Sequence, residues 1–420
     1  PEDVIAWLKR DEGSERYFAR QFVKVFGKPL AEAWQDWIAW EKVFQEKNLA
    51  RINEEALTPT RALTKQALGS ISRSFISADG SEMIGAFRYP GVVAHVGKLS
   101  LADGTVQRLT DIKGPMQYRV TSPAYDPQSD TLFYTADNSN YRDLMRVDLD
   151  SGDKELLIRD ARIGDLAFNS ADASIWGLRH LNGYVSLVRI PPPYDEWNQL
   201  YSWPYGQVPY EMDLSPDGSL LSMSLGEVDA SQYLRIFRTE DLLKGEAKPV
   251  AEYNFVTSVP EGFVFSPDGR YLFGSSFLTG VSNIFRFEIE SGEMEAVSNA
   301  ETGFVRPIPR QDGSLVVFEF TGQGFKPVVI DPVPLEDLSA IEFLGNDIAR
   351  QHPVVRDWNV IDTLADIAYE EKITHQGKYR PYRELEFESG YPIIEGYRDS
   401  LAVGWAMQCQ DPAQLHSMSI

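Results

Sequence analysis

A turn centred on aspartate recurs at nearly equal intervals through the middle of the chain. This repeat predicts a mainly β protein built around a six-bladed β-propeller. The turn aspartates are Asp79, Asp126, Asp172, Asp217, Asp268 and Asp312. They lie 47, 46, 45, 51 and 44 residues apart, and a period near 45 is typical of blades made of four short strands. Of the 420 residues, 43% are hydrophobic, which is enough to fill a large core.

The clearest repeat surrounds Asp268. An apolar strand at 262–265 leads into a Ser-Pro-Asp-Gly turn, in which proline fixes φ, aspartate caps the backbone and glycine takes the positive φ. A β-rich strand follows at 271–273, and residues 284–289 alternate between apolar and polar side chains. A Glu-Ser-Gly turn at 290–292 then leads to an outer strand.

Other repeats keep parts of this pattern. The third strand and its turn recur at 97–104 and at 144–152. The repeat at 163–203 is weaker, because Pro191, Pro192 and Pro193 replace its second turn, and the repeat at 304–344 is weaker too. The predicted propeller covers residues 68–345.

Residues 1–53 have a helical pattern with many aromatic side chains, among them Phe22, Trp34, Trp37 and Trp40. Such a surface either packs within the segment or docks onto a domain that this chain lacks. We expect docking, because the aromatic face is too large for these helices to bury alone. Residues 54–67 are predicted to be a linker.

The pattern changes after the repeats. Residues 346–381 are predicted to form a linker with some helix, since 361–371 has helical spacing. Residues 382–420 are predicted to be a β-rich extension: 382–387 alternates, and Val403, Trp405 and Met407 share one strand face.

The repeats resemble a known family. Ser215-Pro216-Asp217-Gly218 and Ser266-Pro267-Asp268-Gly269, each followed by a strand, are similar to the PD40 or TolB-like, WD40-like repeat of six-bladed propellers. The resemblance covers about 280 residues and implies the fold. It leaves function open, because propellers support binding as well as several enzyme activities.

Both ends carry further resemblances. The stretch from Phe26 to Trp37 is similar to the helical tail of gluzincin-type zinc peptidases, although the His-Glu-x-x-His zinc helix of that family is absent here. The C-terminal strands resemble the entry into an outer-membrane β-barrel of the surface-antigen type. Together these resemblances imply a fragment of a larger envelope protein with a peptidase-like domain upstream and a barrel downstream.

The composition excludes several functions. A formal net charge of −22 argues against nucleic acid as a partner. The single cysteine, Cys409, permits no internal disulfide and fits either a cytosol or a periplasm. The histidines lie far apart in sequence, and no Gly-x-Ser-x-Gly elbow or phosphate loop occurs. We therefore predict no catalytic residue, metal or cofactor for this chain.

The remaining candidate site is the central channel, which the innermost strand of each blade lines. The residues predicted to face it are Arg73, Arg119, Asp165, Glu211, Glu261 and Arg306. This ring is either a ligand-binding surface or only the polar lining of a water-filled tunnel.

Three hypotheses follow. The first is a non-catalytic propeller that binds or scaffolds a protein or peptide in the periplasm or at the outer membrane. The second is a hydrolase, lyase or dehydrogenase acting at the channel mouth, which the three arginines disfavour because such enzymes mostly hold a metal there. The third is a cytoplasmic interaction module.

Overall fold

The computed structural model describes residues 2–9, 13–115, 120–335, 341, 344–354, 373–374, 376–397 and 400–420. The chain divides into two units, residues 1–356 and 357–420. Arg119 and the helical pattern expected at 361–371 lie outside the described residues.

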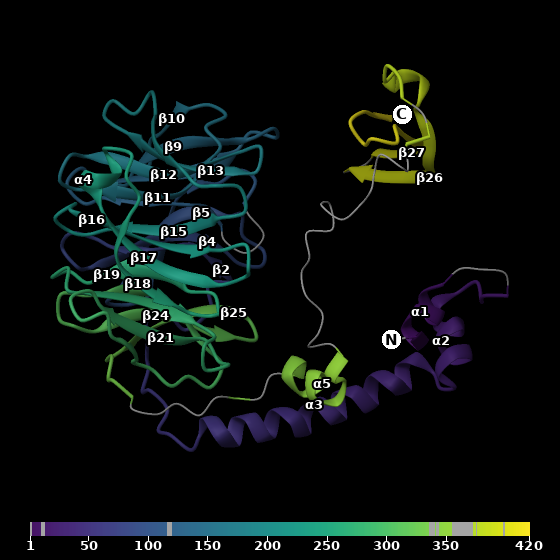
Figure 1. The fold of residues 1–420 in the computed structure, drawn as a ribbon, viewed down its shortest axis with the longest axis horizontal. Helices are drawn as coiled ribbons and strands as arrows, with labels where there is room; N and C mark the ends of the chain where they lie inside the picture. The colour runs from purple at the N-terminus through teal and green to yellow at the C-terminus, as the bar shows by residue number, and fades with distance from the viewer. Residues whose placement is uncertain are drawn as a thin grey trace. The chain divides into compact units, whose positions relative to one another are not determined.

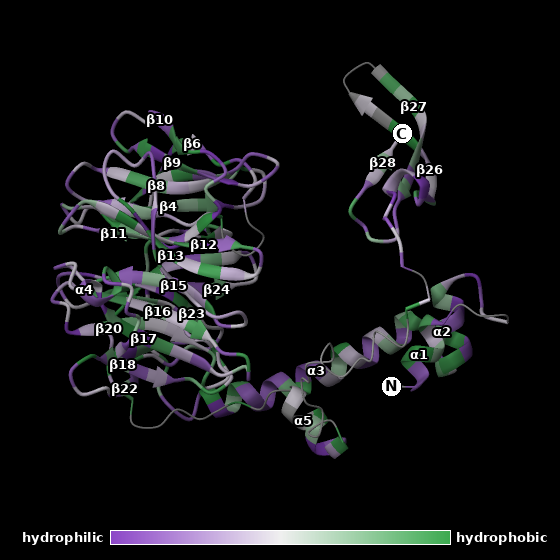
Figure 2. Ribbon diagram, turned by 45° about the horizontal axis from the view of Figure 1, so that its top comes forward, coloured by the Kyte–Doolittle hydropathy of each residue, from purple (hydrophilic) through white to green (hydrophobic). Residues whose placement is uncertain are grey.

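The first unit opens with three helices. They are α1 (Glu2–Leu8), α2 (Phe18–Phe26) and α3 (Leu30–Ile52). Gly27 ends α2 in the left-handed conformation, with φ of 74°, which glycine adopts without strain. Trp7 packs edge-on against Phe22, with ring centroids 5.3 Å apart. Hydrophobic residues also lie along α3 (Figure 2), and the side chains of Trp34, Trp37 and Trp40 on this helix are exposed.

Antiparallel sheets follow, and Figure 1 shows their strands lying side by side in one body. Sheet 1 contains β2 (Ser70–Ile71), β3 (Phe75–Ile76), β4 (Glu82–Arg88), β5 (His95–Ser100) and β6 (Val106–Asp111). Sheet 2 contains β7 (Ala124–Asp126), β8 (Thr131–Asp137), β9 (Arg142–Asp148) and β10 (Lys154–Ile158). Sheet 3 contains β11 (Ile163–Asn169), β12 (Ser174–Leu181), β13 (Tyr184–Ile190) and β14 (Asn198–Ser202).

The remaining sheets repeat this order. Sheet 4 contains β15 (Val208–Leu214), β16 (Leu220–Gly226), β17 (Gln232–Arg238) and β18 (Pro249–Asn254), with the short helix α4 (Thr239–Leu242) before its last strand. Sheet 5 contains β19 (Glu261–Phe265), β20 (Tyr271–Ser276), β21 (Asn283–Glu288) and β22 (Met294–Ala296). Sheet 6 contains β23 (Phe304–Pro309), β24 (Leu315–Thr321), β25 (Gly324–Ile330) and, as its outer strand, β1 (Arg61–Ala62).

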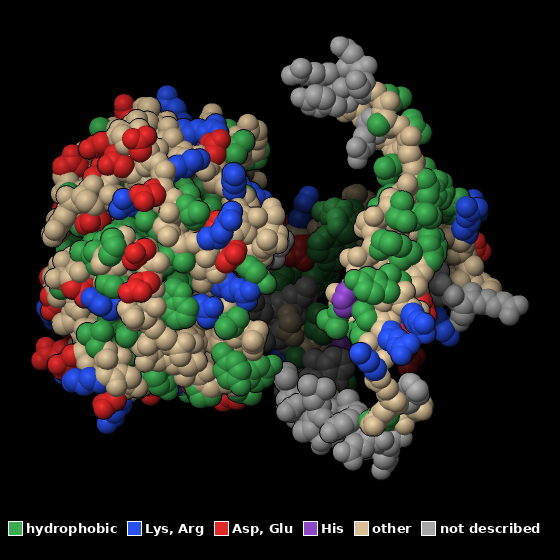
Figure 3. Space-filling view, turned by 90° about the horizontal axis from the view of Figure 1, so that it is seen from above, with side chains coloured by type: hydrophobic (Ala, Val, Ile, Leu, Met, Phe, Trp, Pro, Cys, Tyr) green, Lys and Arg blue, Asp and Glu red, His purple; other side chains and the backbone are tan. Residues whose placement is uncertain are grey.

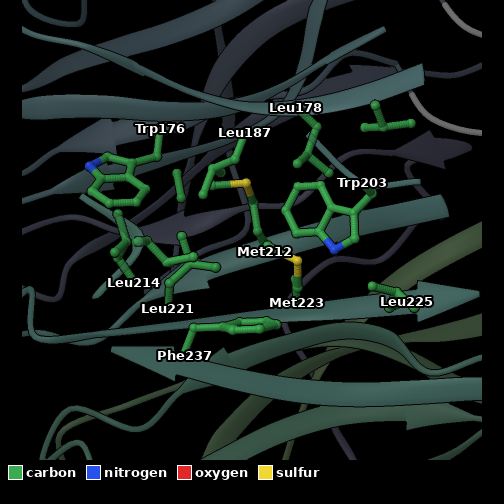
Figure 4. Close-up of a cluster of buried hydrophobic side chains, with 13 residues drawn as sticks. Trp176, Leu178, Leu187, Trp203, Met212, Leu214, Leu221, Met223, Leu225 and Phe237 are labelled. Carbon is green, nitrogen blue, oxygen red and sulfur yellow. The ribbon is translucent and has the colours of Figure 1, made fainter. Parts of the chain in front are cut away.

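The sheets close into a ring, because each packs against the one before it and the one after it. Leu214, Leu221 and Met223 of sheet 4 pack on Trp176 and Leu187 of sheet 3 (Figure 4). Equivalent buried clusters join sheets 1 and 2, 2 and 3, 4 and 5, 5 and 6, and 6 and 1. This arrangement is a β-propeller.

Ring closure uses a segment that sequence patterns assign to a linker. In β1, Arg61 and Ala62 pair with Val329 and Val328 of β25. Asn299 also holds the chain that precedes β1, because its side-chain amide donates to the Ile52 carbonyl at 2.9 Å. The repeat at 304–344 has a weak sequence pattern because it lacks a fourth strand of its own. Its outer strand is β1, which precedes the first sheet in the sequence.

The propeller has two chemically different faces. Turns from the first to the second strand and from the third to the fourth strand of each sheet lie at one face, here named the Asp-turn face. Loops from the second to the third strand, and from one sheet to the next, lie at the other, here named the loop face. Both follow from the up-and-down strand order.

After the propeller come α5 (Leu344–Gln351) and, in the second unit, a short 3-10 turn η2 (Pro381–Arg383). The second unit also contains an antiparallel sheet of β26 (Glu386–Tyr397), β27 (Ser400–Gln410) and β28 (Ser417–Ser419). Leu401, Val403 and Trp405 of β27 are exposed. No helix within the described ranges is long and apolar enough to span a bilayer.

Candidate functional site

The channel of the propeller narrows to a waist formed by the innermost strands. The waist cavity is only about 30 Å³, which holds about two water molecules. Every sheet contributes at least one residue to its lining: Arg73, Ser122, Asp165, Glu211, Gly262 and Arg306.

In four of the innermost strands, the residue that lines the waist lies at a β-bulge. The pairing registers of β11, β15, β19 and β23 with their neighbours each shift at this point. The residue at the shift has positive φ in every case: 48° at Asp165, 44° at Glu211, 61° at Gly262 and 52° at Arg306. A β-bulge re-aims a side chain, and a left-handed conformation costs a non-glycine residue energy. The fold therefore turns Asp165, Glu211 and Arg306 towards the channel at a conformational cost.

Two charged residues of the waist bind each other. Glu211 accepts the backbone N–H of Gly262 on one carboxylate oxygen, and its other oxygen lies 2.9 Å from Arg306 Nη2. Both side chains are largely buried, with 11% of Glu211 and 17% of Arg306 exposed. A buried pair of this kind is fixed in place, since separating it would leave an uncompensated charge.

A second ion pair crosses the channel beside the waist. Arg73 of sheet 1 pairs with Asp213 of sheet 4, and its Nη1 donates to the Met212 carbonyl at 2.9 Å. Asp213 also accepts the Phe265 N–H at 2.8 Å. The guanidinium carbon of Arg73 lies 4.9 Å from the centroid of the Phe75 ring. These contacts close the channel at its centre.

Beyond this pair the channel opens into a funnel of about 640 Å³ on the Asp-turn face. Its floor includes Arg73 and Asp213. Aromatic residues and prolines form part of the walls: Phe75, Tyr125, Pro127, Phe168, Phe265, Pro267, Pro307 and Pro309. Turn residues, among them Asp79 and Asp312, also line it. A funnel of this size admits a side chain or a short stretch of polypeptide.

The residues predicted for the channel divide into three groups. Arg73, Asp165, Glu211 and Arg306 line the waist. Arg119 lies outside the described residues. Glu261 lines neither the waist nor the funnel, and its successor Gly262 occupies the position equivalent to Glu211. The distance to the turn aspartate reveals this register, since Arg73, Glu211, Gly262 and Arg306 each precede it by six residues.

Sequence patterns did not reveal Asp213, Phe75 or Phe168. Asp213 follows Glu211 by two residues on the same strand, so the alternation of β15 could have suggested it. The funnel walls come from separate turns, and no local pattern brings them together. Among the described residues, no group of three or more His, Cys, Asp or Glu side chains is arranged to hold a metal ion.

No family model and no curated protein matches the sequence. Solved structures that resemble the chain include TolB from Acinetobacter baumannii, at 14% identity over 64% of this chain and 65% of that chain, with a TM-score of 0.43. The PQQ-bound aldose sugar dehydrogenase from Streptomyces coelicolor matches at 13% identity over 66% of this chain and 99% of that chain, with a TM-score of 0.49. An oligogalacturonate lyase in complex with manganese matches at 15% identity over 66% and 99%, with a TM-score of 0.44.

The chain thus spans slightly less than two thirds of the length of TolB. The assignment to the β-propeller fold rests on the sheet order and on the packing of each sheet against its two neighbours.

Proposed function

We propose that this chain is a non-catalytic six-bladed propeller of the TolB-like kind that binds a protein or peptide segment in the funnel. The observation that carries this proposal is the contrast between a waist of about 30 Å³ and a funnel of about 640 Å³. At the waist Glu211 pairs with Arg306, and Arg73 pairs with Asp213 beside it, whereas the funnel combines aromatic and proline side chains with polar turn residues.

The funnel chemistry supports polypeptide as the ligand. Stacked aromatic and proline rings bury apolar side chains with little loss of conformational entropy, and such residues are typical of protein-binding surfaces. Ser170 adds a hydrogen-bonding group beside them. An apolar pocket with a few polar groups fixes the orientation of what it binds.

The wider context is also a proposal. We propose that the chain is the middle part of a bacterial envelope protein, with a metallopeptidase-like domain upstream and a membrane-associated part downstream. Two surfaces support this arrangement. Trp34, Trp37 and Trp40 are exposed on α3, and Leu401 and Trp405 are exposed on β27. Exposed apolar surfaces of this extent are typical of interfaces.

Site-directed photo-cross-linking tests the binding site. We would place p-benzoylphenylalanine at Phe168 in the funnel or, as the matched aromatic control, at Tyr205 on the loop face, where 72% of the side chain is exposed. In cells, Phe168 should give a cross-linked polypeptide that Tyr205 does not. Equal adducts at both positions, or none at Phe168, would contradict the proposal. So would turnover of a substrate by the purified chain that is lost on mutating the funnel.

Cell fractionation tests the context. An antibody against the propeller should detect a band well above the 47.4 kDa of this chain in the envelope fraction. A soluble cytoplasmic band near 47.4 kDa would contradict the envelope proposal and leave the funnel hypothesis intact.

A further inference from the structure

The charge around the funnel indicates which chemical class of polypeptide the propeller binds. Building on the proposed funnel-binding function, we infer that the Asp-turn face binds a basic segment whose apolar side chain enters the funnel. The turns between first and second strands place exposed carboxylates on this face: Asp79, Asp172, Asp217, Asp268 and Asp312. Asp79 and Asp312 line the funnel itself.

These carboxylates remain ionised because their turns bind the charged form. Ser77 donates to Asp79 at 2.6 Å, and the Ser81 backbone N–H donates to it at 3.0 Å. These bonds lower the pKa of Asp79 to about 2. Equivalent serine hydroxyls lower the pKa of Asp217, Asp268 and Asp312. Each aspartate is therefore charged at neutral pH.

The outer turns of the same face add further acidic side chains. They include Asp103, Asp150, Asp153, Asp195, Glu196, Glu240, Asp241, Glu246, Glu290 and Glu293. Figure 3 shows Asp and Glu side chains gathered towards the left side of the propeller. Four cations on this face have acidic partners: Lys244 lies 3.6 Å from Asp241, Arg310 lies 3.1 Å from Asp312, Arg189 lies 2.8 Å from Asp172, and Arg270 pairs with Glu288. Lys248 adds a further positive charge. The face therefore keeps a large negative excess.

Charges inside the funnel do not cancel this excess. Arg73 on the floor is paired with Asp213, and Arg310 is paired with Asp312. With Asp79 as the remaining acid, the lining itself is net negative. A rim of one sign around a hollow with aromatic side chains in its walls attracts a ligand of opposite sign and concentrates it at the mouth. A segment with lysine or arginine on both sides of an apolar residue matches both features.

The loop face lacks this character. Its loops expose apolar side chains, such as Tyr205, Val228 and Phe277. Acidic and basic residues are interspersed there, with Arg88, Lys113, Arg142 and Arg162 beside Asp111, Asp137, Asp160 and Asp229. Long-range attraction of a basic partner is thus specific to the Asp-turn face.

Peptide binding provides the test. The probe is a fluorescein-labelled 12-residue peptide of alternating lysine, proline and phenylalanine, compared by fluorescence anisotropy with the same peptide carrying glutamate in place of lysine. We expect the lysine peptide alone to bind the full chain. Its Kd should rise about tenfold between low salt and ~0.3 M salt, because the interaction is screened.

Two quadruple variants test which face of the propeller supplies the negative charge that attracts the peptide. The first combines Asp79→Asn, Asp217→Asn, Asp268→Asn and Asp312→Asn; asparagine retains the turn-forming side chain. The second makes the same change in net charge on the loop face, with Asp111→Asn, Asp137→Asn, Asp229→Asn and Glu301→Gln. The first should weaken binding about tenfold and the second less than twofold. A thermal unfolding curve establishes that each variant is folded.

The outcomes separate this inference from the proposed function. Equal binding of both peptides, no binding of either, an equal effect of both variants, or no salt dependence would overturn the basic partner. A cross-link from Phe168 to an acidic polypeptide segment would also overturn it, while the funnel remained a protein-binding site. Absence of a specific cross-link at Phe168 would instead remove the proposed function.

Discussion

The waist and the funnel are built from the same innermost strands, yet they use charged residues in opposite ways. At the waist, Glu211 and Arg306 satisfy each other and leave room for about two water molecules. In the funnel, the floor pair of Arg73 and Asp213 is also internal, but aromatic and proline side chains form part of the walls. Charged residues that face a channel are therefore not sufficient evidence of a ligand-binding site. Groups that are already paired stabilise the ring, and the ligand must be sought where surface remains uncovered.

The largest expected effect lies at the waist. Glu211→Gln keeps an oxygen for the Gly262 N–H but removes the charge that compensates Arg306. We expect the free energy of unfolding, measured in urea, to fall by about 3 kcal/mol, because a largely buried cation loses its partner. The matched control is Asp36→Asn in the exposed pair with Lys28, which should change the free energy of unfolding far less, because solvent screens that pair. Equal losses would show that the waist pair is not a structural element.

The funnel walls should affect peptide binding directly. Phe168→Ala removes a ring that lines the funnel and stacks near Phe133, at 5.9 Å between centroids. We expect the Kd for the lysine peptide to rise about tenfold, which is typical of an aromatic contact in an interface. Tyr205→Ala on the loop face should leave the Kd unchanged. A loss of binding in both variants, or in neither, would remove the funnel as the binding surface.

Acidic pH should affect the stability of the turn at Asp79 and the affinity for the lysine peptide differently. Asp79 has a pKa lowered to about 2, whereas unfolding restores a value near 3.8. Its stabilising contribution is therefore present above about pH 4 and is lost as the pH falls towards 2. Between pH 7.5 and 5 the rim carboxylates stay charged, so the Kd for the lysine peptide should change less than twofold. A steep loss of affinity within that range would indicate that another titrating group controls binding.

The sequence predicts the repeat well because each blade contains its own turn chemistry. Ser266 and Asp268 determine one turn within a few residues, and the same local pattern recurs along the chain. Closure is not local: β1 joins β25 across more than 260 residues, so residues 54–67 have the pattern of a linker. The channel is intermediate. Four of its residues lie six positions before a turn aspartate, but a bulge decides which neighbour faces inward, so Gly262 rather than Glu261 lines the waist.

The smallest effect concerns a turn on the funnel rim that departs from the repeat. Ala173 follows Asp172 where Gly218, Gly269 and Gly313 follow the aspartates of other turns, and it adopts the same left-handed conformation, with φ of 56°. Glycine adopts this conformation without the steric cost that a Cβ imposes. Ala173→Gly should therefore raise the free energy of unfolding by about 0.5–1 kcal/mol. Peptide binding should be unchanged, because the substitution alters neither the charge of Asp172 nor the funnel walls. A stabilised variant that bound the lysine peptide less tightly would show that the rim turns contact the ligand through their backbone as well as through their charge.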